Sequence, residues 1–111
     1  MRTQTLKIKA HPEVYEELED SRIWYDEKAT NLGVDFLKEV DNAIERIRES
    51  PEAWSWYEKK IGVRKFLVHR FPYAVIYRYD ENMINILAVA NLRRKPGYWK
   101  HKIRDRMKSN N

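Results

Sequence analysis

Three short, strongly apolar stretches follow one another between Gly62 and Trp99. Each is rich in Val, Ile, Phe and Tyr, and they span Val63 to His69, Tyr73 to Tyr79 and Ile84 to Val89. Short stretches of this composition between turn residues are typical of β-strands. The connections Phe71-Pro72 and Asp80-Glu81-Asn82 are short enough to favour antiparallel hairpins. The chain must therefore build its fold around an antiparallel sheet.

The first half of the chain carries the patterns of one strand and two helices. Apolar and polar residues alternate from Thr5 to Ala10, which indicates a half-buried strand. Pro12 suits the first position of a helix, and apolar residues at spacings of three and four continue this helix to about Ala29. A second apolar stripe predicts a helix from about Val34 to Glu49, which ends because Ser50 precedes a proline. The short break between the two predicts an antiparallel helical hairpin on one face of the sheet.

Carboxylates cluster in the first half of the first predicted helix. They are Glu13, Glu16, Glu17, Glu19 and Asp20. Negative charge near the start of a helix suits the helix dipole. We interpret these residues as a solvated face and expect no acid–base pair among them.

Two segments have weaker patterns. The aromatics between Pro51 and Gly62 either pack under a loop or accompany a strand that begins at Ser55 and runs to Lys59. Lys100 to Lys108 is basic and has two apolar residues at helical spacing, which predicts a short surface helix. Residues 1–111 are therefore predicted to form one α+β domain. It would contain an N-terminal strand, an antiparallel helical hairpin, a three-stranded antiparallel sheet (β-α-α-β-β-β) and a short C-terminal basic helix.

The charge balance points to an anionic partner, either nucleic acid or an acidic protein. Lys and Arg number 22 against 17 Asp and Glu, which gives a net charge of +5. The absence of cysteine excludes disulfides and thiolate metal sites. His11, His69 and His101 have no second metal ligand at a recognised spacing, so neither a metal nor a cofactor is expected. No apolar run approaches the roughly 18 residues of a membrane span, so we expect a cytoplasmic protein with no membrane partner.

A group of basic and aromatic residues is the best candidate for a functional site. Arg93, Arg94 and Lys95 leave the last predicted strand, and Tyr98 and Trp99 follow. The arginine fork pairs with phosphate or carboxylate, and an aromatic face can stack on a base. Further binding candidates lie in and around the first of the three predicted strands: Lys59, Lys60, Lys65 and Arg70. The alternative is an ordinary solubilising surface, which weighs most for the two lysines at 59 and 60.

A basic site without carboxylates could also cleave RNA. The 2′-hydroxyl would attack the adjacent phosphate while Arg and Lys stabilise the developing charge. A Tyr, His or Lys would move the protons, and His69 and His101 are available for this besides a tyrosine. The catalytic candidates for such a reaction are Arg64, Arg93, Arg94 and Tyr98.

Several short motifs between Leu6 and Trp99 stand in a characteristic order. They are His11-Pro12 opening a helix, Phe36-Leu37 with Ile44 and Ile47, Ser50-Pro51, Val63-Arg64, Phe71-Pro72-Tyr73 with Val75 and Tyr77, Ile86-Leu87-Ala88-Val89, and Arg93-Arg94-Lys95-Pro96 with Tyr98-Trp99. Together they resemble the RelE/ParE superfamily of toxins from bacterial type II toxin–antitoxin systems. The resemblance implies a small basic toxin of growth-inhibition and plasmid-stabilisation systems, neutralised by a cognate acidic antitoxin.

The superfamily includes two activities. RelE-like members cleave mRNA in the ribosomal A site, using Lys and Arg on the sheet and a Tyr near the C-terminus. Where that pattern has lysine or arginine, this chain has Leu67, Ala74 and Leu92. Only Lys65 and Tyr98 match it in type.

ParE-like members inhibit DNA gyrase. Arg64, Phe71-Pro72-Tyr73 and Arg93-Arg94 are closer to this branch, although Asn91 replaces a histidine often found there. The leading hypothesis is therefore a ParE-like toxin. The alternatives are a ribosome-dependent endoribonuclease of the RelE type, which would make the protein an enzyme, and a non-toxic binding module of the same fold.

Overall fold

The computed structural model describes residues 6–94 and 97–101. The helices are α1 (Pro12–Lys28) and α2 (Leu32–Glu49). The strands are β1 (Lys7–Ala10), β2 (Trp56–Glu58), β3 (Val63–Leu67), β4 (Tyr73–Asp80) and β5 (Met83–Asn91). Single turns of 3-10 helix span Lys59–Ile61 and Tyr98–Lys100. The predicted α+β order is confirmed, and most of the predicted C-terminal basic helix lies outside the described residues.

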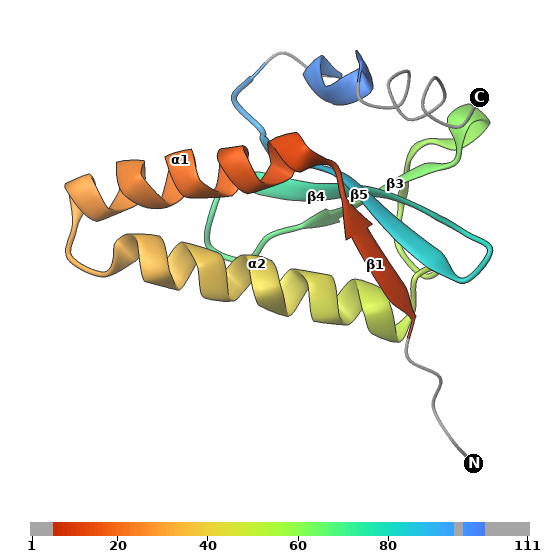
Figure 1. The fold of residues 1–111 in the computed structure, drawn as a ribbon, viewed down its shortest axis with the longest axis horizontal. Coiled ribbons are helices and arrows are strands. Elements are labelled where there is room, and N and C mark those ends of the chain that lie inside the picture. Colours follow the sequence, from red (N-terminus) through yellow and green to blue (C-terminus); the bar gives the residue numbers. More distant parts are fainter. Residues whose placement is uncertain (1–5, 95–96, 102–111) are drawn as a thin grey trace.

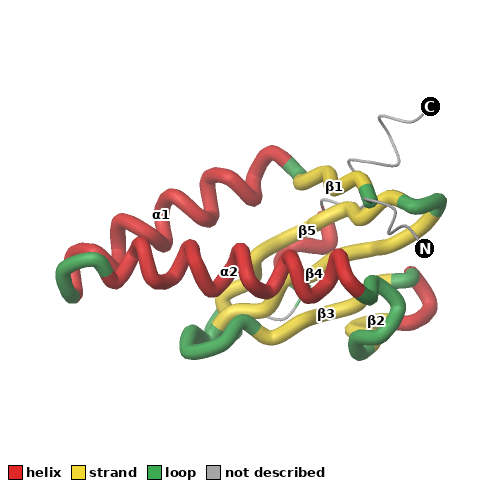
Figure 2. The backbone as a smooth tube through the Cα atoms, turned by 90° about the horizontal axis from the view of Figure 1, so that it is seen from below, coloured by secondary structure: helices red, strands yellow, loops and turns green. Residues whose placement is uncertain are grey.

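The strands form one mixed sheet in the order β1-β5-β4-β3-β2. β1 runs parallel to β5, and every other neighbouring pair is antiparallel. The hairpin of α1 and α2 covers one face of this sheet (Figures 1 and 2). The described sheet has more strands than the predicted three, because β1 joins one edge and the short β2 joins the other. Neither helix has an apolar stretch long enough to cross a membrane within the described residues.

The two helices approach each other closely where they meet. Asp26 Oδ1 accepts the backbone N–H of Gly33 at 2.7 Å, and Asp26 Oδ2 pairs with Arg22 at 3.1 Å. A Cβ atom at position 33 would overlap the backbone oxygen of Arg22. The hairpin therefore requires glycine at this position.

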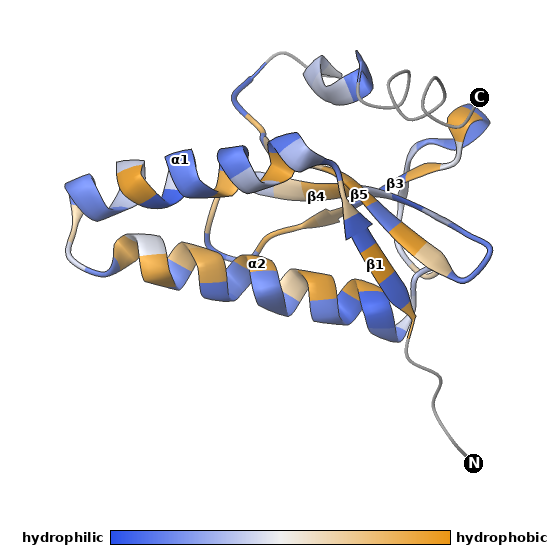
Figure 3. Ribbon diagram, in the orientation of Figure 1, coloured by the Kyte–Doolittle hydropathy of each residue, from blue (hydrophilic) through white to orange (hydrophobic). Residues whose placement is uncertain are grey.

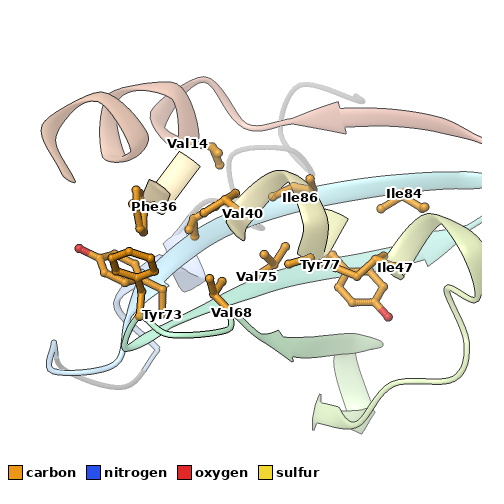
Figure 4. Close-up of a cluster of buried hydrophobic side chains, with 13 residues drawn as sticks. Val14, Phe36, Val40, Ile47, Val68, Tyr73, Val75, Tyr77, Ile84 and Ile86 are labelled. Atoms are coloured by element: carbon orange, nitrogen blue, oxygen red, sulfur yellow. The ribbon is translucent and has the colours of Figure 1, made fainter. Parts of the chain in front are cut away.

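The main core lies between the hairpin and the sheet (Figure 4). Its fully buried members include Phe36, Val40 and Ile47 from α2 and Val75 and Tyr77 from β4. Figure 3 shows the hydrophobic colour along β4, β5 and one side of α2. Burial of these apolar surfaces supplies the main driving force for folding.

A second, smaller core covers the opposite face of the sheet. It contains Val63, Ala74, Ile76, Leu87, Ala88, Ala90 and Trp99. Ile76 pairs with Ala88 and Tyr77 pairs with Ile86, so Leu87 forms a β-bulge. The bulge directs two consecutive residues of β5 to this face. We call it the far face, because the helices cover the other one.

Candidate functional site

The structure places the predicted arginines Arg64 and Arg93 at different parts of the sheet. Arg64 pairs with Tyr77 in the middle of β4, whereas Asn91, just before Arg93, pairs with Tyr73 at the start of β4. These two positions are four residue steps apart along β4, which corresponds to roughly 13 Å. A catalytic site made of all the predicted residues would require Arg64 and Arg93 to lie together. They do not.

Arg64 is held by neighbouring aromatic residues. One guanidinium nitrogen donates to the carbonyl of Trp54 at 2.7 Å, and the Cζ atom lies 3.6 Å from the ring centroid of Trp56. These contacts hold Trp54, just before β2, and Trp56, at the start of β2, against β3. The geometry gives Arg64 a structural role.

The other predicted binding residues are dispersed. Lys59 and Lys60 are exposed on the turn between β2 and β3. Lys65 lies on the far face, with its Nζ atom 5.9 Å from the ring of Tyr57. Arg70 pairs with Asp35 of α2 at 3.5 Å. Lys95 lies outside the described residues.

Arg93 and Arg94 lie in the turn that follows β5, and both are exposed. Asn91 organises this turn, because its side-chain oxygen accepts the N–H of Arg93 at 2.9 Å and its carbonyl accepts the N–H of Arg94 at 3.0 Å. The Arg94 Cζ atom lies 3.7 Å from the ring centroid of Tyr98. The structure therefore brings together Arg94 and Tyr98 from the predicted catalytic set.

Tyr98 is fixed by a carboxylate of α1. Its hydroxyl donates to Glu17 Oε2 at 2.9 Å, while Glu17 Oε1 accepts the N–H of Val89 at 3.2 Å. β1 pairs with β5 only as far as Ile86. Beyond that point, the Glu17 carboxylate accepts a backbone N–H at the edge of β5. Burial and the negative charge of Glu17 raise the pKa of Tyr98 well above its ordinary value, and Arg94 opposes this only in part.

A second carboxylate of α1 contacts the C-terminal turn. The Nε2 atom of His101 lies 3.2 Å from Glu13 Oε1, and its Nδ1 atom lies 3.0 Å from the carbonyl oxygen of Tyr98. The interpretation of Glu17 as part of a solvated face is therefore wrong, whereas the side chain of Glu13 is 45% exposed while it contacts His101. Sequence spacing gave no signal of these contacts, because the partners of Glu17 and Glu13 lie 81 and 88 residues away.

Trp99 belongs to the far-face core. Its side chain is 1% exposed, and its ring packs against Tyr57 with centroids 5.1 Å apart. A buried ring has no free face for a base. The prediction of Trp99 as a binding residue is therefore wrong for this structure.

A pocket of about 340 Å³ lies between α1 and the turn after β5. We call it the Trp24–Arg93 pocket. It is lined by Asp20, Ser21, Trp24, Tyr25, Pro72, Tyr73, Asn91 and Arg93. The hydroxyls of Ser21 and Tyr73 are 3.0 Å apart, and burial raises the pKa of Tyr25 beside them. Trp24 is 48% exposed and was not among the residues predicted from sequence.

A larger groove, of about 820 Å³, runs between α2 and the segment from Phe66 to Arg70. It includes His69 and the exposed Leu67. His69 thus lies in a different pocket from His101, which lines the cavity beside Tyr98. No group of three potential metal ligands occurs among residues 6–94 and 97–101.

Comparisons with known proteins bear on the family and on the fold. The profile of the family described as ParE toxin of type II toxin-antitoxin system, parDE, matches residues 8–96. A solved structure titled "Chromosomal ParDE TA system from P. aeruginosa" superposes with a TM-score of 0.71 at 13% sequence identity. The match covers 82% of this chain and 100% of that one, and at this identity it bears on the fold alone. The comparison with curated proteins found no match.

Proposed function

This chain belongs to the ParE toxin family of type II toxin–antitoxin systems, and we propose that it arrests growth by binding DNA gyrase. In the proposed system, an acidic antitoxin segment folds onto the toxin and holds it inactive. The toxin would act through surface contacts and would cleave no RNA. Its activity would therefore depend on the turn after β5, where exposed cations gather.

The state of Tyr98 is the observation that carries this proposal. A general base for RNA cleavage must give up its proton near neutral pH. The hydroxyl of Tyr98 instead keeps its proton and donates a hydrogen bond to Glu17, and burial and that carboxylate raise the pKa of this hydroxyl. Such a hydroxyl is a poor proton acceptor.

The distribution of charge supports the same proposal. Ala74 is buried on the far face, and Leu67 and Leu92 are exposed apolar residues. These are the positions at which the resemblance implies lysine or arginine in RNA-cleaving members. Arg64, which could otherwise stabilise a developing charge, is engaged by Trp54 and Trp56.

Inducible expression in bacteria tests the proposal. Growth should stop on induction and should resume when the product of the neighbouring antitoxin gene is co-expressed. Primer extension on abundant mRNAs should reveal no new cleavage sites at early times after induction. New cleavage sites inside translated codons would instead establish the RelE-like activity, and harmless expression would support a non-toxic binding module.

A further inference from the structure

We propose that the Trp24–Arg93 pocket receives an acidic side chain of the target protein, and that it is a primary contact of the toxin with gyrase. This inference rests on the proposed function. To the proposed function it adds where the toxin contacts gyrase. It also says what gyrase must present there, which is a carboxylate beside an apolar group.

Arg93 provides the first argument. Most arginines that the structure describes pair with carboxylates: Arg22, Arg46, Arg48, Arg70 and Arg78. Arg64 donates to a backbone carbonyl, and Arg94 lies over a tyrosine ring. The side chain of Arg93 has no such partner within the described residues, and it is exposed at the rim of the pocket. An arginine fork pairs with a carboxylate through two parallel hydrogen bonds.

The walls of the pocket provide the second argument. Trp24 and Pro72 supply apolar surface, Tyr25, Tyr73 and Ser21 supply hydroxyls, and the exposed Asp20 supplies a carboxylate on the α1 side. Trp, Tyr and Arg are the residue types that contribute most of the binding energy at protein interfaces. Trp24 is nearly half exposed, with Lys28 Nζ 4.7 Å from its ring centroid, and it lines the same pocket as Arg93. This pair of residues matches that composition.

The rigidity of the pocket favours the target over the antitoxin as the occupant. Tyr73 is buried and hydrogen-bonded to Ser21, and the N–H of Leu92 donates to the carbonyl of Pro72 at 2.9 Å, which fixes the turn that carries Arg93. A small preformed pocket suits one protruding side chain of a folded protein. The larger groove beside α2 offers more room for a segment that folds on binding.

The experiment compares Trp24→Ala and Arg93→Glu with wild type in two assays, inhibition of gyrase supercoiling and binding of the co-purified antitoxin. Two matched controls change similar residues elsewhere. Tyr15→Ala removes a 65% exposed aromatic from the same helix, and Lys38→Glu reverses an exposed cation on α2. Thermal melting verifies that each variant is folded. Arg93→Lys keeps the charge without the fork and should give an intermediate result.

We expect the two pocket variants to need at least about tenfold more toxin for half-maximal gyrase inhibition, with antitoxin affinity changed by less than about threefold. The two control variants should inhibit like wild type. Pocket variants that inhibit gyrase as well as wild type would overturn the inference and leave the proposed function intact. A loss of antitoxin binding with unchanged inhibition would assign the pocket to the antitoxin and also overturn it. If wild-type toxin itself does not inhibit gyrase, the proposed function fails, and this inference fails with it.

Discussion

The hydroxyl of Tyr98 donates a hydrogen bond to Glu17 at 2.9 Å, although 81 residues separate the two along the chain. The other oxygen of Glu17 accepts the backbone N–H of Val89. One carboxylate thus connects α1, the edge of β5 and the C-terminal turn. Because Arg94 stacks on Tyr98, this connection also sets the position of a cation that a partner can reach.

Removal of the Glu17 carboxylate should destabilise the protein. Glu17→Ala leaves two partly buried donors without their acceptor, which should lower the free energy of unfolding by about 1–3 kcal/mol. Glu17→Gln should cost less, because the amide oxygen can still accept one of the two bonds. Urea denaturation measures both effects. The control is Glu16→Ala, which removes an exposed neighbouring carboxylate, and equal stability of the two alanine variants would contradict the prediction.

Tyr77 should limit stability at alkaline pH. Its ring is fully buried, its hydroxyl donates to the carbonyl of Pro51 at 2.7 Å, and burial raises the pKa of Tyr77 to about 12 from 10.0. Because the folded state holds this proton more tightly, the stabilisation is complete below the unfolded pKa and is lost as pH rises through the folded pKa. The pH window is therefore from about 10 to about 12.

Tyr77→Phe should flatten this alkaline decline. The variant should also lose about 1 kcal/mol at neutral pH, because the Pro51 carbonyl loses its donor. Thermal melting of both proteins across the alkaline range provides the measurement. Curves for wild type and variant that fall in parallel would show that another group governs the decline.

Arg64 should prove structural. Arg64→Lys keeps the charge, but lysine cannot both donate to the Trp54 carbonyl and cover the ring of Trp56, so we expect a loss of about 1–2 kcal/mol. Hydrogen exchange should become faster in residues 54–56. Gyrase inhibition per folded molecule should not change. Unchanged stability with lost inhibition would instead make Arg64 a contact residue.

Gly33→Ala should destabilise the helical hairpin, although alanine is intrinsically the better helix former by about 1 kcal/mol. The added methyl group would meet the backbone oxygen of Arg22, which cannot move without shifting α1. Overpacking of this kind costs about 1–3 kcal/mol. A lower melting temperature is the expected result. Asp41→Ala, an exposed position on α2, serves as the control.

Patterns that are local in sequence predicted most of the fold. The stripe of α2 repeats with the helical period, and the apolar stretches of β3, β4 and β5 are short and bounded by turn residues, so each could be recognised directly. β2 has only three residues. Such a short strand has too little sequence pattern to distinguish it from a loop, so both interpretations remained open. Neither the bulge at Leu87 nor the burial of Trp99 has a local signature. The bulge depends on how β5 pairs with β4, and the burial of Trp99 depends on contact with the distant Tyr57.

The candidate site was predicted less well than the fold. Arg93 and Arg94 were found because they follow a buried strand directly. Glu17 and Trp24 were missed because their surroundings come from the turn after β5 and from the start of β4. A carboxylate or an aromatic on an otherwise polar helix face carries no sign of such partners. Only the packing of α1 against β5 brings Glu17 to Tyr98 and Trp24 to Arg93.

The most direct test of this account is a supercoiling assay with purified DNA gyrase, relaxed plasmid and increasing amounts of the purified toxin. Wild-type toxin should abolish supercoiling in a dose-dependent manner, and added antitoxin should restore it. In parallel, a ribosome-programmed mRNA should remain intact at the same toxin concentrations. Undiminished supercoiling together with cleavage of that mRNA would contradict the account.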